Sequence, residues 1–422
     1  MERTMIEVFG ARVRQARLLR RMTATSVVGL AGWSNARQTK IEKSPTIQLS
    51  ADEVARLTEL FRFPARFFSS EPQSRVSAGE LLFRAPKSMT VGEQEFLATF
   101  ASLAGDFLGD LDKQSKLPPV KIPSVSDESP RRPTVVQAAG RLREAMGVEP
   151  DDPLDDLMYE AERLGAPVIV RRRAPGEWES EFAATPGRAR DEKHLGYSSW
   201  VGRHRDRPLV VLRETESWER IRFTVAHELG HLVLHSRAYC SVNSSEELEA
   251  NRFATELLAP IAAIAPELPR VMSLLNLKPL KDKWGLSLGS LIMHIRDSGV
   301  IDVKRAKMLT TQLHSRINPA TGHTWGMTEP GWDEREPERP RLLRKWVERC
   351  YGGASVPMLA ARESLIFPPD LLDWFLATQR PSPGADRQPV AASVGSSGAG
   401  SAAPGSRPQV VRLDDFRRGK TP

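Results

Sequence analysis

Cysteine is nearly absent from this chain, which has only two in 422 residues, Cys240 and Cys350. They lie far apart and form no Cys-x-x-Cys pair, so the pattern indicates neither a disulfide framework nor a zinc ribbon. The sequence also has no apolar run near the roughly 18 residues that a membrane helix needs, and its start has no apolar signal segment. We therefore expect a cytoplasmic protein without membrane association, in which any metal is held by histidines and carboxylates.

The remaining composition is that of a globular protein. Hydrophobic residues make up 40% of the chain, and this length allows two or three domains with buried cores. The formal net charge is +7 at pH 7. A basic balance fits an anionic partner such as nucleic acid, but a solvated basic surface has the same signature, so the distribution of the charge matters more.

The first seventy residues predict four or five short helices. Five arginines surround an apolar stripe in the segment ARVRQARLLRR, which predicts a basic amphipathic first helix. A turn at residues 32–34 separates two further helices, the second of which begins near Asn35. Ser50 and Glu53 have the spacing of a capping box, which predicts the start of another helix.

A linker and a mixed region follow. Residues 79–117 predict a helix, and the Pro- and Ser-rich run after them predicts a domain boundary near residues 118–134. Beyond it, helical periodicity accompanies three β-branched or aromatic runs that predict strands. These runs are residues 166–172, 195–202 and 208–213. Residues 245–316 predict helices only, so the expected fold class is α+β, mostly α.

The segment VAHELGHLVL, residues 225–234, carries the strongest chemical signal in the sequence. Four residues advance a helix by about 6 Å and turn it by about 400 degrees, so His227 and His231 project from one face at a separation suited to one zinc ion. Glu228 lies beside them, where its carboxylate can reach a water at an open zinc position and act as general base. With 8 histidines in the chain, chance produces this pattern on the order of 0.01 times.

A catalytic zinc needs a third protein ligand, and the next predicted helix supplies carboxylates. Glu247 shares a helical face with mainly apolar positions, whereas Glu249 lies on a charged side. Glu247 is therefore the predicted ligand and Glu249 the reserve, while a capping box of Glu247 with Ser244 is the alternative. His235 is expected to support the site or to pack, because a continuous helix carries it about 6 Å beyond His231.

Four segments together resemble one peptidase family. They are RIRFTVAHELGHLVLH, EELEANRFATELLAP, LKDKWGLSLGSLIMHIRDSGVI and EPGWDEREPERP, and they are similar to the ImmA/IrrE family of bacterial metallopeptidases. The resemblance is to the architecture with an N-terminal XRE-type helix-turn-helix, and it covers roughly residues 5–345. It implies a gluzincin-like Zn²⁺ site with the ligands His227, His231 and Glu247 and with Glu228 as the catalytic glutamate. It also implies cleavage of a repressor, which switches genes on.

The resemblance and the composition together divide the chain into five regions. They are an XRE-like helix-turn-helix domain, 1–75; a helical connector with a Pro-rich linker, 76–134; a zinc metallopeptidase domain with a small sheet, 135–265; a helical C-terminal region with a helix-turn-helix-like segment, 266–380; and a disordered tail, 381–422. In the C-terminal region, the run WGLSLGSLIMHI resembles a helix-turn-helix pair, but simple packing around Trp284 and Leu291 explains it equally well.

An XRE-like helix-turn-helix places the start of its second helix in the major groove of DNA. Here that start would expose side chains of the kinds that bond bases and phosphates, namely Ser34, Asn35, Arg37, Gln38 and Lys40. Arg12 and Arg17 would add phosphate contacts. The pattern departs from that of the family because Gln38 stands where an aliphatic core residue is usual. A helical domain that contacts a protein partner or regulates the peptidase is therefore the alternative.

Two functions from different classes follow. The first is a zinc endopeptidase, coupled to a DNA-binding-type domain, that cleaves a repressor or another regulatory protein to control transcription. Its partners are then a protein substrate and DNA. The second is a transcription regulator whose peptidase-like domain is a sensor with little or no proteolysis. The intact set of His227, Glu228 and His231 favours the first function.

Overall fold

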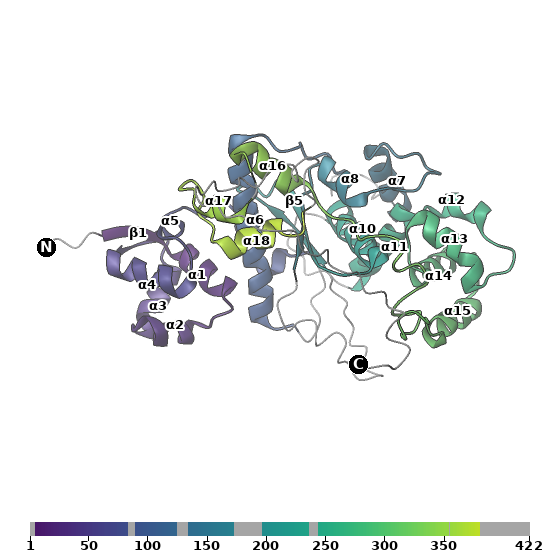
Figure 1. Cartoon of the computed structure of the whole chain (residues 1–422), viewed down its shortest axis with the longest axis horizontal. Helices are drawn as coiled ribbons and strands as arrows, with labels where there is room; N and C mark the ends of the chain where they lie inside the picture. Colours follow the sequence, from purple (N-terminus) through teal and green to yellow (C-terminus); the bar gives the residue numbers. More distant parts are fainter. Residues whose placement is uncertain are drawn as a thin grey trace, which may run out of the picture. The chain divides into compact units, whose positions relative to one another are not determined.

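The computed structural model describes residues 5–82, 89–124, 134–172, 196–235, 244–353 and 355–379. These residues are mostly helical with two small sheets, in agreement with the α+β class, and they lie in one compact unit, Met1–Ser382 (Figure 1). Two hydrophobic cores cross the region boundaries expected at residues 75 and 265. The predicted disordered tail, 381–422, lies outside the described residues. Of the helices in the described ranges, none is long and apolar enough to cross a membrane.

The N-terminal residues form short helices and a small antiparallel sheet. The helices are α1 (Gly10–Leu19), α2 (Ala24–Ala31), α3 (Asn35–Lys43), α4 (Ala51–Phe61) and α5 (Ala65–Phe68). α2 ends at Gly32, whose φ of 69° suits glycine, and the Ser34 side chain caps α3. Our sequence analysis missed the strands β1 (Met5–Phe9) and β2 (Thr46–Ser50). Their pairing joins residues far apart in the chain, which a local pattern does not register.

A long helix connects this part to the rest of the unit. It is α6 (Val91–Gln114), and it begins after a capping box of Thr90 and Glu93. The helix predicted over residues 79–117 therefore starts later than expected, and a single 3-10 turn, η1 (Ala78–Glu80), precedes it. Residues 125–133 of the predicted linker lie outside the described residues.

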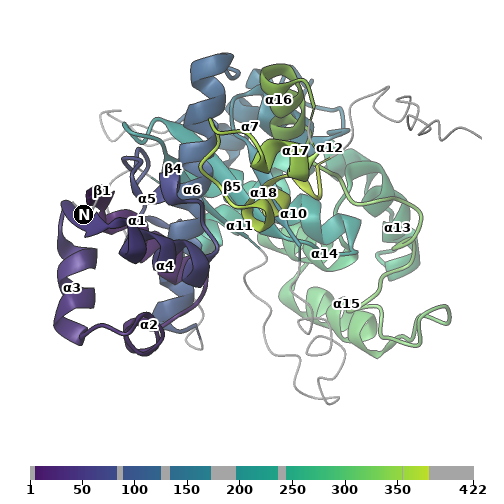
Figure 2. The ribbon, with the colours of Figure 1, turned by 60° about the vertical axis from the view of Figure 1, so that its left-hand side comes forward.

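A three-stranded sheet lies between α6 and α10 (Trp218–Leu234). Its strands are β3 (Val168–Arg171), β4 (Gly196–Val201) and β5 (Arg207–Arg213), in the order β3-β5-β4, with β3 parallel and β4 antiparallel to the central β5. These strands confirm the three predicted runs. Alternate side chains belong to the two cores, so Val211 packs in the core of α6 and Val210 in that of α10. In both ribbon views β5 lies between these helices (Figure 1, Figure 2).

Helices supply most of the remaining core on the α10 side. They are α7 (Val135–Ala145), α8 (Leu157–Arg163), α11 (Ser244–Leu258), α12 (Ile261–Ile264), α13 (Leu274–Trp284), α14 (Leu288–Asp297) and α15 (Val303–Ser315), with the 3-10 turn η2 (Ala265–Glu267) after α12. The predicted helical stretch 245–316 is thus confirmed as a series of separate helices.

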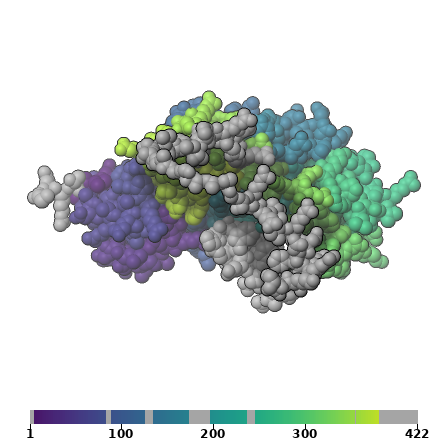
Figure 3. Space-filling view, in the orientation of Figure 1, coloured from purple at the N-terminus to yellow at the C-terminus, as the bar shows by residue number. Residues whose placement is uncertain are grey.

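The last helices return to the core on the α6 side. They are α16 (Leu342–Tyr351), α17 (Val356–Ala360) and α18 (Pro369–Leu376). Phe375 of α18 stacks on Phe107 of α6, with 5.3 Å between ring centroids, and Asp370 pairs with Arg20 next to α1. Figure 3 shows this yellow-green segment beside the purple and blue N-terminal residues. The N-terminal helices therefore share their core with α6 and with the C-terminal helices.

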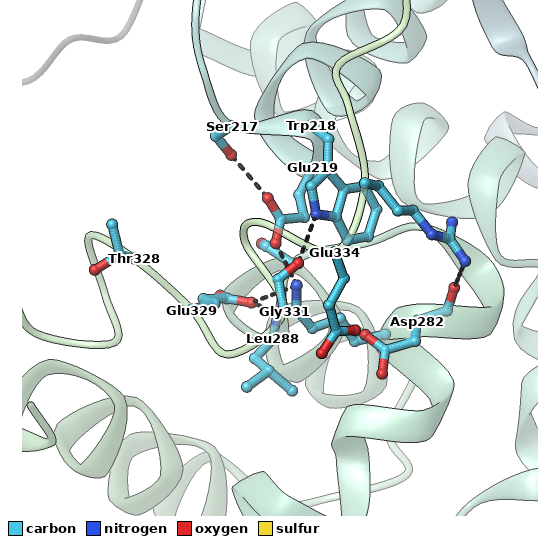
Figure 4. Close-up of polar contacts among 12 residues, drawn as sticks. Ser217, Trp218, Glu219, Asp282, Leu288, Thr328, Glu329, Gly331 and Glu334 are labelled. Carbon is cyan, nitrogen blue, oxygen red and sulfur yellow. Dashed lines mark hydrogen bonds and ion pairs between the residues drawn. The ribbon is translucent and has the colours of Figure 1, made fainter. Parts of the chain in front are cut away.

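Polar contacts of Trp218 and Glu219 fix the first turn of α10 to the C-terminal region (Figure 4). Lys281 of α13 has no exposed surface, pairs with Glu219 of α10, and lies 3.6 Å from a carboxylate oxygen of Glu329. Glu329 also accepts two backbone N–H groups at the start of α14. Trp218 donates its indole N–H to the Gly331 carbonyl oxygen at 3.0 Å. These contacts set the position of the helix that carries the predicted metal site.

Candidate metal centre

α10 presents both histidines of the predicted site. Ser217 caps the helix, because its Oγ accepts the Arg220 backbone N–H at 3.2 Å. One side of the helix packs on β4 and β5. On the side toward α11, the His231 side chain is fully buried and that of His227 is 15% exposed. The helix thus carries one buried and one partly exposed imidazole, one helical turn apart.

The two imidazoles and Glu247 converge. Nε2 of His227 lies 3.0 Å from Nε2 of His231, and the Glu247 carboxylate oxygens lie 3.6 Å and 3.5 Å from these two nitrogens. One ligand atom from each residue lies within 4.8 Å of the other two. Ligand atoms 2.0–2.1 Å from a tetrahedral zinc ion lie about 3.3 Å apart, so this donor set fits zinc in both chemistry and spacing. The roles of the three residues as ligands stay a prediction.

Close packing of α10 and α11 brings Glu247 to the histidines. Gly230 of α10 faces Phe253 of α11, and a Cβ at position 230 would come within 3.0 Å of that ring. The missing side chain therefore permits the close approach of the two helices. The alternative capping partner of Glu247, Ser244, has its side chain outside the described residues.

The Nδ1 atom of each imidazole has its own polar partner. Nδ1 of His227 lies 3.0 Å from Oδ1 of Asn251, and Nδ1 of His231 lies 2.9 Å from Nδ1 of His235. These contacts orient the rings so that both Nε2 atoms face Glu247. An outer partner of this kind fixes the tautomer of a metal-binding histidine.

His235 caps the end of α10 and lies beside His231, as its spacing of four residues allows. Its expected role in supporting the site or in packing stays a prediction. Its Nε2 lies 3.3 Å from the carboxylate of Glu249, the reserve ligand. Burial, followed by the neighbouring His231, lowers the pKa of His235. A neutral His235 can accept the His231 N–H at Nδ1 and donate its Nε2–H to Glu249. Glu249 therefore contacts His235 and not the candidate ligands themselves.

Glu228 contacts the sheet. Its side chain is 2% exposed, and Oε2 accepts a hydrogen bond from Ser198 Oγ of β4 at 2.8 Å. Burial raises the pKa of the Glu228 carboxyl well above its usual range, the negative charge of Glu247 adds to this, and the Ser198 hydrogen bond acts in the opposite direction. The role of Glu228 as general base stays a prediction.

Sequence analysis did not single out Asn251 and Ser198. Asn251 follows Glu247 by four residues, so helical spacing was an available signal for a shared face. Ser198 lies in a strand whose six residues are all buried, and a hydroxyl at such a position needs a partner. The identity of that partner was not readable, because Glu228 lies 30 residues further along the chain.

The predicted DNA-contacting residues of α3 differ in exposure. Ser34, Asn35 and Lys40 are exposed, while Arg37 is partly exposed and pairs with Glu53 at 2.7 Å. Their contacts with DNA stay a prediction.

Gln38 is a correction, since the expectation that it is exposed is wrong. It is 1% exposed, its Oε1 accepts the Trp33 indole N–H at 2.9 Å, and its Nε2 donates to Glu42. The amide is therefore buried, and its polar atoms are bonded within the protein.

The phosphate contact expected of Arg12 is also wrong, because its side chain is buried, and Arg17 is held in an ion pair. Arg12 is 1% exposed, its Nη1 lies 2.5 Å from a carboxylate oxygen of Asp106 in α6, and its Nε donates to the Ser70 carbonyl oxygen at 2.9 Å. Arg17 forms a bidentate pair with Glu42, with distances of 2.6 Å and 2.8 Å. Both guanidinium groups are thus bound inside the protein.

Comparison with known families concerns the region of the candidate metal centre. Residues 178–296 match the family model Peptidase_M78, described as the IrrE N-terminal-like domain. The matched residues include α10, α11 and all four predicted residues of the metal site, but they are well under half of the chain. No curated protein matches the chain. The part of the chain that carries the candidate metal centre is therefore similar to the peptidase domain of the ImmA/IrrE family.

Proposed function

We propose that this chain is a zinc-dependent endopeptidase that cleaves a repressor or another regulatory protein. The observation that carries the proposal is the convergence of His227, His231 and Glu247 within a segment that matches a peptidase family. Two imidazoles and one carboxylate, with a fourth position left for water, are a typical donor set of catalytic zinc. When bound, zinc supplies Lewis acidity that lowers the pKa of a coordinated water to about 7.

The chain's own residues then handle the proton and hold the site. Glu228 accepts the proton of the attacking water and delivers it to the leaving amine, as a general base that becomes a general acid. Asn251 and His235 hold the two imidazoles through their Nδ1 atoms. Their hydrogen bonds keep both Nε2 atoms available for the metal.

The proposal includes binding of DNA by the N-terminal helices, which brings the peptidase to a DNA-bound substrate. It is supported by the exposed residues of α3, which follows α2 after a short turn. With Gln38, Arg12 and Arg17 bound within the protein, the exposed polar residues on this helix are Asn35, Thr39, Lys40 and Lys43. They combine groups that bond bases with cations that bond phosphates.

Metal content and cleavage test the proposal together. We expect about one zinc per purified full-length chain. Glu228→Gln should retain this zinc and cleave candidate repressors, encoded near the gene of this protein, at least about 100-fold more slowly. Glu216→Gln is the matched control, because Glu216 is an exposed carboxylate that precedes α10.

The sensor function predicts a different result in cells. If Glu228→Gln complements a deletion as fully as the wild-type chain does, proteolysis is not the function of this site, and the peptidase interpretation fails. Loss of complementation in Glu228→Gln, with full complementation by Glu216→Gln, supports the peptidase.

A further inference from the structure

The strand next to α10 has a hydroxyl where packing alone would favour an apolar side chain. Ser198 is fully buried in the middle of β4. Trp200, on the same face of the strand, belongs to the core of α10, and a Cβ at Gly196 would come within 2.9 Å of Thr224 of α10. The face of β4 that carries Ser198 is therefore the face packed against the helix of the candidate site.

The Ser198 hydroxyl is directed to the carboxylate of Glu228. Its Oγ lies 2.8 Å from Glu228 Oε2 and 3.3 Å from the Glu228 carbonyl oxygen. A serine hydroxyl has one proton to donate, and the shorter distance and the charge of the acceptor both favour the carboxylate. Within this part of the structure, one strand hydroxyl thus holds one oxygen of the predicted general base.

Ser198 is itself held on both edges of β4. Its register partner on the inner side is Val210 of β5. On the other edge, the Leu82 backbone N–H donates to the Ser198 carbonyl oxygen at 2.8 Å. The Ser198 backbone N–H donates to the Leu82 carbonyl oxygen at 3.5 Å. A donor on a strand that is bonded on both sides keeps a more constant position than a donor on a loop.

We propose that Ser198 is a positioning residue for Glu228, whose hydroxyl fixes Oε2 against the sheet so that Oε1 takes the proton of the attacking water. This inference rests on the proposed peptidase function. The terminal torsion of a glutamate is broad, so a carboxylate without this donor samples many orientations. Proton transfer requires the accepting oxygen within hydrogen-bond reach of the water, so these other orientations are unproductive.

Packing and positioning predict different effects of substitution at Ser198. Ser198→Ala keeps the volume of the strand side chain nearly unchanged but removes the donor. Ser198→Thr keeps the donor and adds a methyl group. Ser199→Ala is the matched control, because Ser199 is the next residue of the same strand and donates to the Glu80 backbone carbonyl oxygen at 3.2 Å instead.

Binding of acetohydroxamate to the zinc-loaded full-length chain tests the proposal without turnover. This acid chelates zinc through its two oxygens and gives up a proton, which a well-oriented carboxylate beside the metal can accept. We expect the Kd for acetohydroxamate to rise about 10-fold in Ser198→Ala, the size expected when a hydrogen bond to a charged group is lost. Ser198→Thr should restore the affinity, and Ser199→Ala should bind as the wild type does.

Zinc content, melting temperature and cleavage complete the test. Ser198→Ala should keep its zinc and its melting temperature, and for cleavage its kcat should fall while KM stays the same. Wild-type affinity for acetohydroxamate in Ser198→Ala, or loss of zinc from that variant, overturns the proposal. If Glu228→Gln also binds acetohydroxamate as the wild type does, the proposed role of Glu228 has failed rather than that of Ser198 alone.

Discussion

α1 and α10 both carry a conspicuous pattern of polar side chains, but the fold uses the two patterns in different ways. On α10 the histidines face one point, as their spacing of four residues predicts, and α11 supplies the carboxylate. On α1 two of the arginines that suggested a DNA-binding surface form ion pairs inside the protein. The relation between two residues of one helix follows from helical geometry, whereas the exposure of a charged side chain depends on which elements pack around it.

The buried ion pair of Arg12 makes the N-terminal helices part of a larger core. Arg12 of α1 binds Asp106 of α6, and the core around α1 includes α6 and α16 to α18. Residues 1–75 are therefore not expected to be stable in isolation, because removing their partners would expose this core to water. DNA binding should accordingly be measured with the full-length chain.

The largest effect should come from the two glutamates of α11. Glu247→Ala removes a predicted ligand. Loss of a residue that only supports a ligand lowers metal affinity about 10- to 100-fold, so the zinc affinity of Glu247→Ala should fall by more than this. Glu249→Ala removes only the partner of His235, which is itself the outer partner of His231, so its zinc affinity should fall by no more than that range. Competition with a chromophoric chelator measures both affinities. A larger loss in Glu249→Ala than in Glu247→Ala would reverse the assignment.

The second effect concerns the arginines of α1. Arg12→Ala should lower the free energy of unfolding by about 3 to 5 kcal/mol, because it leaves Asp106 buried without its cation. Burial already raises the pKa of Asp106, and Arg12 opposes this rise. Arg14→Ala is the control, since Arg14 and Glu95 form a surface pair with side chains 51% and 31% exposed, and it should cost about 0 to 1 kcal/mol. Urea denaturation of the full chain compares them, and equal effects would contradict a structural role specific to Arg12.

A third, smaller effect should distinguish sequence recognition from general affinity for DNA. Asn35 is exposed at the first position of α3. Asn35→Ala should reduce the difference between specific and nonspecific binding by about 1 to 3 kcal/mol at one base pair, if its amide makes a bidentate contact with a base. Fluorescence titration with promoter fragments and with scrambled DNA measures this difference. If the ratio of specific to nonspecific affinity is the same in Asn35→Ala as in the wild type, Asn35 does not read a base.

The smallest effect is expected from a single exposed lysine. Lys40→Ala should weaken binding to all sequences alike and lower the slope of log affinity against log salt by about 1, because one phosphate contact is lost. Arg62→Ala removes an exposed cation after α4 and should leave the slope unchanged. Should the full chain bind no DNA at low salt, α3 would be better explained as a surface for a protein partner.

Much of the candidate metal centre could be predicted from the sequence because its parts lie on two helices that are close in the chain. The spacing of His227 and His231 defines their common face, and the helical face of Glu247 distinguishes it from Glu249. The three strands of the central sheet were also predictable, since each is a buried run of β-branched and aromatic residues.

Only the tertiary structure decided the contacts between distant segments. Ser198 lies against Glu228, Arg12 pairs with Asp106, and β1 pairs with β2, and each of these contacts joins residues at least 30 positions apart. A periodic pattern shows which side of an element is buried, but it carries no information about the element that covers that side. Arginines in an amphipathic helix are therefore equally consistent with solvent, phosphate or a buried carboxylate, and here the packing of α6 against α1 selects the carboxylate for Arg12.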